Sequence, residues 1–162
     1  HLGYALEVFF MLSHYFKSYP TVVFAKFKGK VFPTITMISR SLVCFTELFE
    51  LFYPVNALGK RVKIVPHNIF DLLNIQALAR INDCGDPTYV KGGGLYLQTQ
   101  SFTIEDNVRL MNVLMIKFGC SCTMHLQRNQ QVIYISSASM QRLLPLLMPH
   151  MSSSMLYKIT KR

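Results

Sequence analysis

Residues 121–136 read Ser-Cys-Thr-Met-His-Leu-Gln-Arg-Asn-Gln-Gln-Val-Ile-Tyr-Ile-Ser, and this stretch decides the fold. From Cys122 to Gln127, apolar and polar residues alternate, a period of two that is typical of a strand with one buried face. The pair Arg128-Asn129 separates this strand from a second apolar run that ends at Ile135. Two such runs joined by a two-residue turn predict a β-hairpin.

Helical segments flank this hairpin on both sides. Thr103, with Asp106 three residues later, opens a helix that ends at Gly119. Ser139 opens a last helix, which Pro145 and Pro149 are expected to break. The C-terminal part of the chain therefore predicts the order α-β-β-α.

The same order is predicted near the start of the chain. The elements are a helix over 1–17, strands over 21–28 and 31–39, and a helix that Ser41 caps and Pro54 ends. This repetition predicts an internal duplication, with chance similarity of two short α+β units as the alternative. Between the units the sequence predicts a connector over 55–68, a helix over 75–84, a turn at Gly92-Gly93-Gly94 and a strand over 95–100.

The composition is basic and apolar. The chain has 17 Lys and Arg against 8 Asp and Glu, a formal net charge of +9, and 51% hydrophobic residues. This apolar content excludes a disordered chain. The charge favours a phosphate backbone or an anionic membrane as partner, with a merely basic surface as the alternative. The longest uncharged stretch, residues 143–157, is too short and too rich in Pro and Ser to cross a membrane.

The four cysteines do not indicate a metal site. Cys44, Cys84, Cys120 and Cys122 form no CxxC pair and have no histidine at zinc-ligand spacing. Cys44 and Cys122 fall at apolar positions of their elements. We therefore predict reduced core cysteines, which fits an intracellular or organellar compartment.

Polar residues gather on one face of the predicted strands. In residues 95–100, Tyr96, Gln98 and Gln100 alternate with leucine. Such a face suits hydrogen bonds to base edges and phosphates, whereas an ordinary solvated sheet face is the alternative; the net charge favours nucleic acid. The residues predicted to bind nucleic acid are Lys26, Lys28, Lys30, Thr34, Thr36, Arg40, Lys60, Arg61, Lys63, Lys91, Tyr96, Gln98, Gln100, Thr123, His125, Gln127, Arg128 and Lys158.

Several strings resemble the LAGLIDADG homing endonucleases. Residues 41–83 resemble the segment that leads into the second signature helix of that family, and Gly94-Leu-Tyr-Leu-Gln-Thr-Gln-Ser-Phe-Thr103 resembles the strand and helix start after it. Met155-Leu-Tyr-Lys158 resembles the end of the same domain. The resemblance implies an α+β fold: a saddle of antiparallel sheets with packed helices and a pseudo-twofold αββα repeat. It divides the chain into a truncated first half, residues 1–66, and a second half, residues 67–162, with a degenerate signature helix.

The family implies two signature helices, each ending in an acid that holds divalent metal such as magnesium. The chain opens in what resembles the helix after the first signature, so we expect that signature and its acid to lie outside these residues. In the second signature, residues 78–86, Gly85 stands at the acid position and Asp86 at the glycine position. Asp83 and Asp86 either hold one metal or are solvated at a helix end. We predict no catalytic residue, no metal and no cofactor, with magnesium only if endonuclease activity survives.

The signature helix also carries Arg80 and Asn82, whose polar groups are expected to change the packing against a twin helix, because unpaired buried polar groups cost roughly 1–3 kcal/mol each. The function expected from these departures is a catalytically inactive RNA-binding protein. Because the family is carried by organellar introns, the resemblance implies a mitochondrial ribonucleoprotein such as the mitochondrial ribosome. The partners would be ribosomal RNA and neighbouring ribosomal proteins, without a membrane.

Three alternatives remain open at this point. The first is a maturase-like intron-splicing cofactor. The second is an active DNA endonuclease whose first signature helix lies outside this chain, and the third is a protein-interaction module. RNA is favoured over DNA by context alone, because no residue is identified that reads a 2′-hydroxyl.

Overall fold

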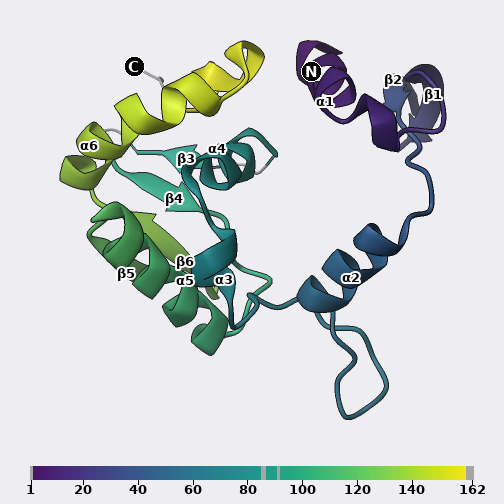
Figure 1. Cartoon of the computed structure of the whole chain (residues 1–162). Coiled ribbons are helices and arrows are strands. Elements are labelled where there is room, and N and C mark those ends of the chain that lie inside the picture. Colours follow the sequence, from purple (N-terminus) through teal and green to yellow (C-terminus); the bar gives the residue numbers. More distant parts are fainter. Residues whose placement is uncertain (1, 85–86, 91, 160–162) are drawn as a thin grey trace.

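The computed structural model describes residues 2–84, 87–90 and 92–159, with Asp83 and Cys84 described by their backbone alone (Figure 1). Its helices are α1 (Leu2–Met11), α2 (Val43–Phe52), α3 (Ile69–Leu72), α4 (Ile75–Cys84), α5 (Ile104–Phe118) and α6 (Ser137–Leu147), with short 3-10 helices η1 (Ser13–Tyr15), η2 (Met148–His150) and η3 (Ser153–Lys158). Its strands are β1 (Thr21–Phe27), β2 (Lys30–Thr36), β3 (Thr88–Tyr89), β4 (Leu95–Leu97), β5 (Cys122–Gln127) and β6 (Gln130–Ile135). The predicted α-β-β-α order is therefore present twice, as α1-β1-β2-α2 and α5-β5-β6-α6.

The main sheet is antiparallel and has four strands in the order β3-β4-β6-β5. Ile135 pairs with Leu95 on one side and with Cys122 on the other, so apolar positions line up across three strands. These side chains pack against α5 and α6, whose Leu114 and Leu143 belong to the same buried cluster. One face of the sheet thus packs in the core, and the other carries polar and aromatic side chains together with the buried Val132.

The core lies in the second half of the chain. Its cluster of buried apolar side chains runs from Val65 to Ile159, and Leu114 and Ile133 are 0% exposed. In the first half, β1, β2 and α2 contain no buried residue. There, Phe9 is buried against the rings of Phe16 and Tyr19 at centroid distances of 5.4 and 5.3 Å. The two αββα units therefore share an order of elements but not a common degree of packing.

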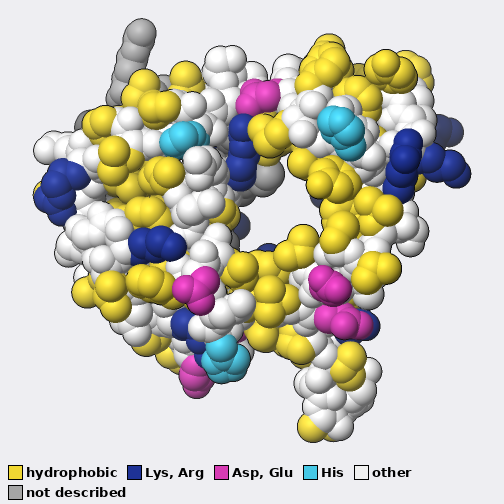
Figure 2. All heavy atoms as spheres, viewed as in Figure 1, with side chains coloured by type: hydrophobic (Ala, Val, Ile, Leu, Met, Phe, Trp, Pro, Cys, Tyr) yellow, Lys and Arg dark blue, Asp and Glu magenta, His cyan; other side chains and the backbone are white. Residues whose placement is uncertain are grey.

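The two halves meet at two places. At one, α1 lies against α4 and η3, and Arg80 Nη1 of α4 donates to Glu7 Oε1 of α1 at 3.0 Å. At the other, Phe52 at the end of α2 packs against the core cluster of the second half. Between these contacts, Figure 2 shows an opening bordered in part by hydrophobic side chains.

Helix caps follow the sequence in one half and depart from it in the other. Thr103 caps α5 as predicted, with its Oγ1 accepting from the Asp106 amide at 3.2 Å, and Gly119 ends the helix at φ +62°. Ser41 does not cap α2, because its N-cap residue is Leu42 without a side-chain cap bond. Ser136, not Ser139, accepts the capping bond of α6.

The prediction that Pro145 breaks the last helix was wrong. Helix α6 continues through Pro145 to Leu147. Pro145 lacks the amide that would donate to the Gln141 carbonyl, so α6 loses one hydrogen bond in its last turns. Leu143 and Leu147 are both buried in the core, and their packing keeps the final turn helical. In the described part of the chain, no helix is long and apolar enough to span a bilayer.

The cysteine prediction holds for one residue and fails for the other. Cys122 is buried, and this burial raises the pKa of its thiol to about 12, so the thiol stays protonated at neutral pH. Cys44 is exposed, because it lies in the first turn of α2 and that helix contacts the core through Phe52 at its other end. Periodicity alone identified an apolar face of α2 but could not show whether anything covers it.

Candidate nucleic-acid interface

Strand register places a band of polar and aromatic side chains on the face of the main sheet that lies opposite the core. Tyr134 of β6 pairs with Tyr96 of β4 and with Thr123 of β5, so these three side chains share one face. His125 lies two residues beyond Thr123 and therefore points to the same side. This polar face is the one predicted from the alternation in the sequence.

Tyr96, His125 and Tyr134 form an aromatic cluster on this face. The His125 and Tyr134 rings stack with centroids 4.9 Å apart, and the Tyr96 ring lies 5.5 and 5.0 Å from them. The Tyr96 hydroxyl lies 2.9 Å from His125 Nδ1, and Thr123 Oγ1 lies 3.0 Å from His125 Nε2. Because both ring nitrogens have hydrogen-bond partners, the imidazole is held in one orientation.

The glycine run supports this cluster. Gly94 lies directly beneath the Tyr134 ring, and a Cβ added there would overlap the ring atoms. Gly92 and Gly93 have φ values of +110° and +98°, which side chains rarely adopt. The predicted turn is confirmed, and the structure adds that its last glycine allows a tyrosine to approach the backbone.

Beside the cluster lies a polar depression of about 370 Å³, which we call the amide hollow. Gln98 Nε2 donates to Thr88 Oγ1 at 2.9 Å, and Gln100 Nε2 donates to Gln98 Oε1. Arg128 occupies the β5–β6 turn at φ +48°. The lining residues are Thr88, Gln98, Gln100, Gln127, Arg128 and Gln130, all of which carry hydrogen-bonding side chains.

The hairpin of β1 and β2 does not extend this surface. It forms a separate two-stranded sheet, in which Thr34 pairs with Val23 and Lys30 with Phe27, whereas Lys26 pairs with Val31. The register thus places Lys26 on the face opposite Thr34, Thr36 and Lys30. We predicted one surface for these four residues. Because odd-numbered positions of β1 pair with even-numbered positions of β2, Lys26 lies on one face of the hairpin and the other three lie on the opposite face.

Three other predicted contacts are engaged within the protein itself. Arg40 Nε donates to the Phe16 carbonyl at 3.2 Å, and Arg61 Nη1 donates to the Tyr53 carbonyl at 2.9 Å. Lys63 Nζ lies 4.8 Å from the centroid of the Phe102 ring. Lys28 lies in the β1–β2 turn, Lys60 lies in the connector after α2, Lys158 lies in η3, and Lys91 lies outside the described residues.

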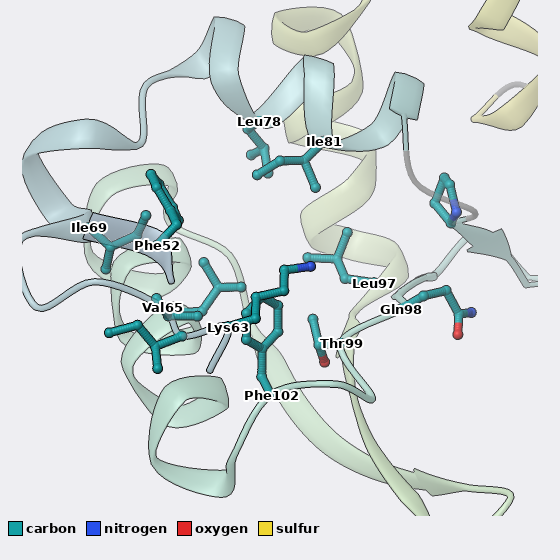
Figure 3. Close-up of a pocket in the computed structure, with 13 residues that line it drawn as sticks. Phe52, Lys63, Val65, Ile69, Leu78, Ile81, Leu97, Gln98, Thr99 and Phe102 are labelled. Atoms are coloured by element: carbon teal, nitrogen blue, oxygen red, sulfur yellow. The ribbon is translucent and has the colours of Figure 1, made fainter. Parts of the chain in front are cut away.

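An apolar cavity of about 460 Å³ lies between α4, the connector and β4 (Figure 3). Leu78 and Ile81 of α4 line it, together with Phe52, and Ile81 is 44% exposed. Thr99 lines the same cavity, and its buried Oγ1 makes no hydrogen bond to the described residues. The family resemblance predicts that a second signature helix packs against α4, on a side that the sequence does not specify.

Of the two polar residues expected to change the packing of α4, Arg80 is paired and Asn82 is paired in part. Arg80 pairs with Glu7, whose pKa is lowered chiefly by a hydrogen bond from Ser152 and also by Arg80. Asn82 is buried, and its Nδ2 donates to the Leu78 carbonyl at 2.9 Å, while its Oδ1 has no partner among the described residues. Whether these groups change a helix–helix interface stays a prediction.

The predicted positions of the signature acid lie at the edge of the described chain. Gly85 and Asp86 lie outside the described residues, and only the backbone of Asp83 is described. Among the side chains that the structure describes, no three His, Cys, Asp or Glu residues come together as a possible metal site. No cleavage step is assigned to these residues, and the loss of the acids stays a prediction.

Comparison with known proteins places this architecture in a family. The sequence model of the LAGLIDADG DNA endonuclease family matches residues 1–143. The chain belongs to this family. The intron-encoded endonuclease ai4 of Dictyostelium discoideum is 31% identical to this LAGLIDADG protein over 135 residues, which are 80% of this chain and 79% of that protein. The cytochrome b mRNA maturase bI2 of Debaryomyces hansenii is 33% identical over 134 residues, 81% of this chain and 48% of the maturase.

A solved structure shares the fold of this LAGLIDADG protein. The homing endonuclease I-WcaI bound to its DNA recognition sequence superposes with a TM-score of 0.84 over 98% of this chain and 71% of that chain, at 24% identity. The predicted α+β fold with antiparallel sheets and packed helices is thereby confirmed. At this level of identity the likeness concerns the fold alone.

Three members of the polar face were not predicted. Tyr134 lies in an apolar run of the sequence, and its pairing with Tyr96 and Thr123 places it on this face. Gln130 was predicted to begin this strand, as it does in β6, but it was not named as a site residue. Thr88 lies in β3, which is only two residues long and gives too short a pattern to detect.

Proposed function

We propose that this LAGLIDADG family member binds RNA through the polar face of the β3–β6 sheet and does not cut nucleic acid. The amide hollow beside the aromatic cluster is the observation that carries this proposal. Amide and guanidinium groups hydrogen-bond base edges, and aromatic rings stack on unpaired bases, which is the usual chemistry of sequence-specific RNA recognition. The family supplies a fold that, in I-WcaI, is seen bound to DNA.

Charge supports the same proposal. The formal net charge of +9 attracts a phosphate backbone over a distance of about 10 Å at 0.1 M salt. In the second signature, Gly85 stands where the family pattern has its metal-binding acid, and Asp86 carries the negative charge one residue later. A basic surface keeps its attraction for polynucleotide when its acids no longer hold metal.

The client that we propose is a structured organellar RNA, and the chain would serve as a structural component of a mitochondrial ribonucleoprotein such as the mitochondrial ribosome. What supports the compartment is the family resemblance to proteins carried by organellar introns. A second candidate is an intron-splicing cofactor. It is favoured by the 33% identity to a cytochrome b mRNA maturase across 81% of this chain.

Replacing Arg128 with alanine tests the proposed face. Arg128 is exposed at the β5–β6 turn, and losing one phosphate contact should weaken binding to a structured RNA by roughly fivefold to tenfold at 0.1 M salt. Fluorescence anisotropy with a labelled stem–loop RNA measures this change. The matched control is Arg142→Ala on α6, which removes a cationic side chain from the helical side of the sheet. Equal losses in the two variants would place the RNA elsewhere.

A further inference from the structure

The amide hollow has the features of a site for a single base. We propose that it binds one unpaired adenine of an RNA, and that Gln100 hydrogen-bonds the N6–N7 edge of that base. The proposal rests on the proposed function and names its substrate: an RNA with a nucleotide displaced from its helix. The edge of a paired base is read by an element that enters the groove, such as a helix or a β-ribbon, whereas the hollow is recessed.

A relay of side chains fixes the Gln100 amide. Thr88 Oγ1 accepts from Gln98 Nε2, and Gln98 Oε1 in turn accepts from Gln100 Nε2. One Gln100 N–H is used in this relay, which leaves its second N–H as a donor and its Oε1 as an acceptor. That donor–acceptor pair is the complement of adenine N7 and the N6 amino group.

The size of the hollow fits one nucleoside. Its volume of about 370 Å³ lies near the lower end of small-ligand pockets, which span roughly 300–1,000 Å³. Its walls come from different elements: Thr88 and Gln98 from one side of the sheet, and Gln127 and Gln130 from the β5–β6 hairpin. A base inserted between them would be held on both sides, as a displaced base requires.

The surroundings of the hollow suit the rest of the nucleotide. Arg128 lines the hollow from a turn whose backbone is held at φ +48°, and its guanidinium can contact the phosphate of the displaced nucleotide. Tyr96 and His125 precede Gln98 and Gln127 by two residues, so the aromatic cluster adjoins the hollow on the same face. A neighbouring base can stack on these rings.

Four stem–loop RNAs that differ at a single bulge test the assignment. The bulge is adenosine, 7-deaza-adenosine (which lacks the N7 acceptor) or uridine, and the fourth stem has no bulge. At constant salt the intact chain should bind the adenosine bulge roughly 5- to 100-fold more tightly than the uridine bulge or the stem without a bulge, the range of one bidentate amide–adenine contact. It should also prefer adenosine over 7-deaza-adenosine, by a smaller factor, because that base loses one of the two hydrogen bonds. Gln100→Ala should remove this preference, and so should Gln100→Glu, which keeps the shape but loses the donor.

Gln141→Ala, an exposed glutamine on α6, is the matched control and should keep the preference. Circular dichroism checks that each variant is folded. Equal binding of all four RNAs by the folded intact chain would overturn the adenine site and leave the proposed RNA binding in place. No binding to any of them would overturn both. A preference that survives Gln100→Ala would refute the assignment of Gln100.

Discussion

RNA binding by this chain is expected to weaken about 100-fold when the salt concentration rises from roughly 50 to 200 mM. Each phosphate contact releases condensed counterions. The logarithm of the association constant therefore falls with the logarithm of the salt concentration, with a slope near −0.9 per contact, so a fourfold rise in salt lowers the affinity about 3.5-fold per contact. Four contacts therefore account for the expected loss. A titration of a labelled structured RNA by anisotropy at several salt concentrations gives the slope directly.

The slope of this salt dependence also distinguishes the phosphate-contact model from a protein-interaction module. With Arg128→Ala, the magnitude of the slope should fall by about one unit if this residue contacts a phosphate. Arg142→Ala, on the helical side, should leave the slope unchanged. An affinity that ignores salt would eliminate the phosphate-contact model and favour the alternative of a protein-interaction module.

Residues 1–162 are expected not to cleave duplex nucleic acid in the presence of magnesium, and Gly85→Asp alone is expected not to restore cleavage. Metal-assisted cleavage requires that the attacking and leaving oxygens be stabilised together, and the family uses two signature acids for this purpose. Within residues 1–162 the sequence offers one signature, so the variant would supply a single acid. Since enzymes accelerate reactions by roughly 10⁶-fold or more, the cleavage rate of an active nuclease would exceed that of this chain by a large factor.

Nicking of supercoiled plasmid, with and without magnesium, measures this activity with high sensitivity. EDTA is the control for metal dependence, and Asp86→Asn tests whether any residual nicking depends on the remaining acid. Magnesium-dependent nicking by the unaltered chain, lost in Asp86→Asn, would contradict the prediction and support the active endonuclease.

The second half of the fold could be predicted from local signals. Helix α4 has the bounds that its periodicity predicts, and Thr103 and Gly119 delimit α5 because a capping side chain and a left-handed glycine act within a few residues. The alternation of the β5–β6 hairpin gives both its register and its buried face. These features depend on residues that are close together in the sequence, so they can be recognised from a single sequence.

In the first half of the chain, local sequence patterns predicted the elements but not their burial. Its helices and strands were predicted, but the periodicity of β1 and β2 gave no sign that both strands would be exposed. Burial depends on which elements meet in space, and that is a long-range property. For the same reason the sequence could not place Lys26 and Thr34 on opposite faces, because this depends on the pairing register.

The candidate site was predicted in part. Gln98, Gln100, Gln127 and Arg128 were identified from alternation and from the hairpin tip, and the structure brings all four to one hollow. Arg40 and Arg61 were chosen for their charge, and each donates to a backbone carbonyl, while their contact with nucleic acid stays a prediction. A charged side chain near a helix end or a loop carbonyl has internal partners that composition does not reveal.

Ultraviolet cross-linking of the intact chain to a bound structured RNA, followed by mass-spectrometric mapping of the linked peptides, tests the central claim most directly. Cross-links are expected in the peptides that contain Tyr96, His125 and Tyr134, because these rings lie on the polar face of the sheet. Cross-links confined to α5 and α6, with none on the sheet face, would contradict the account.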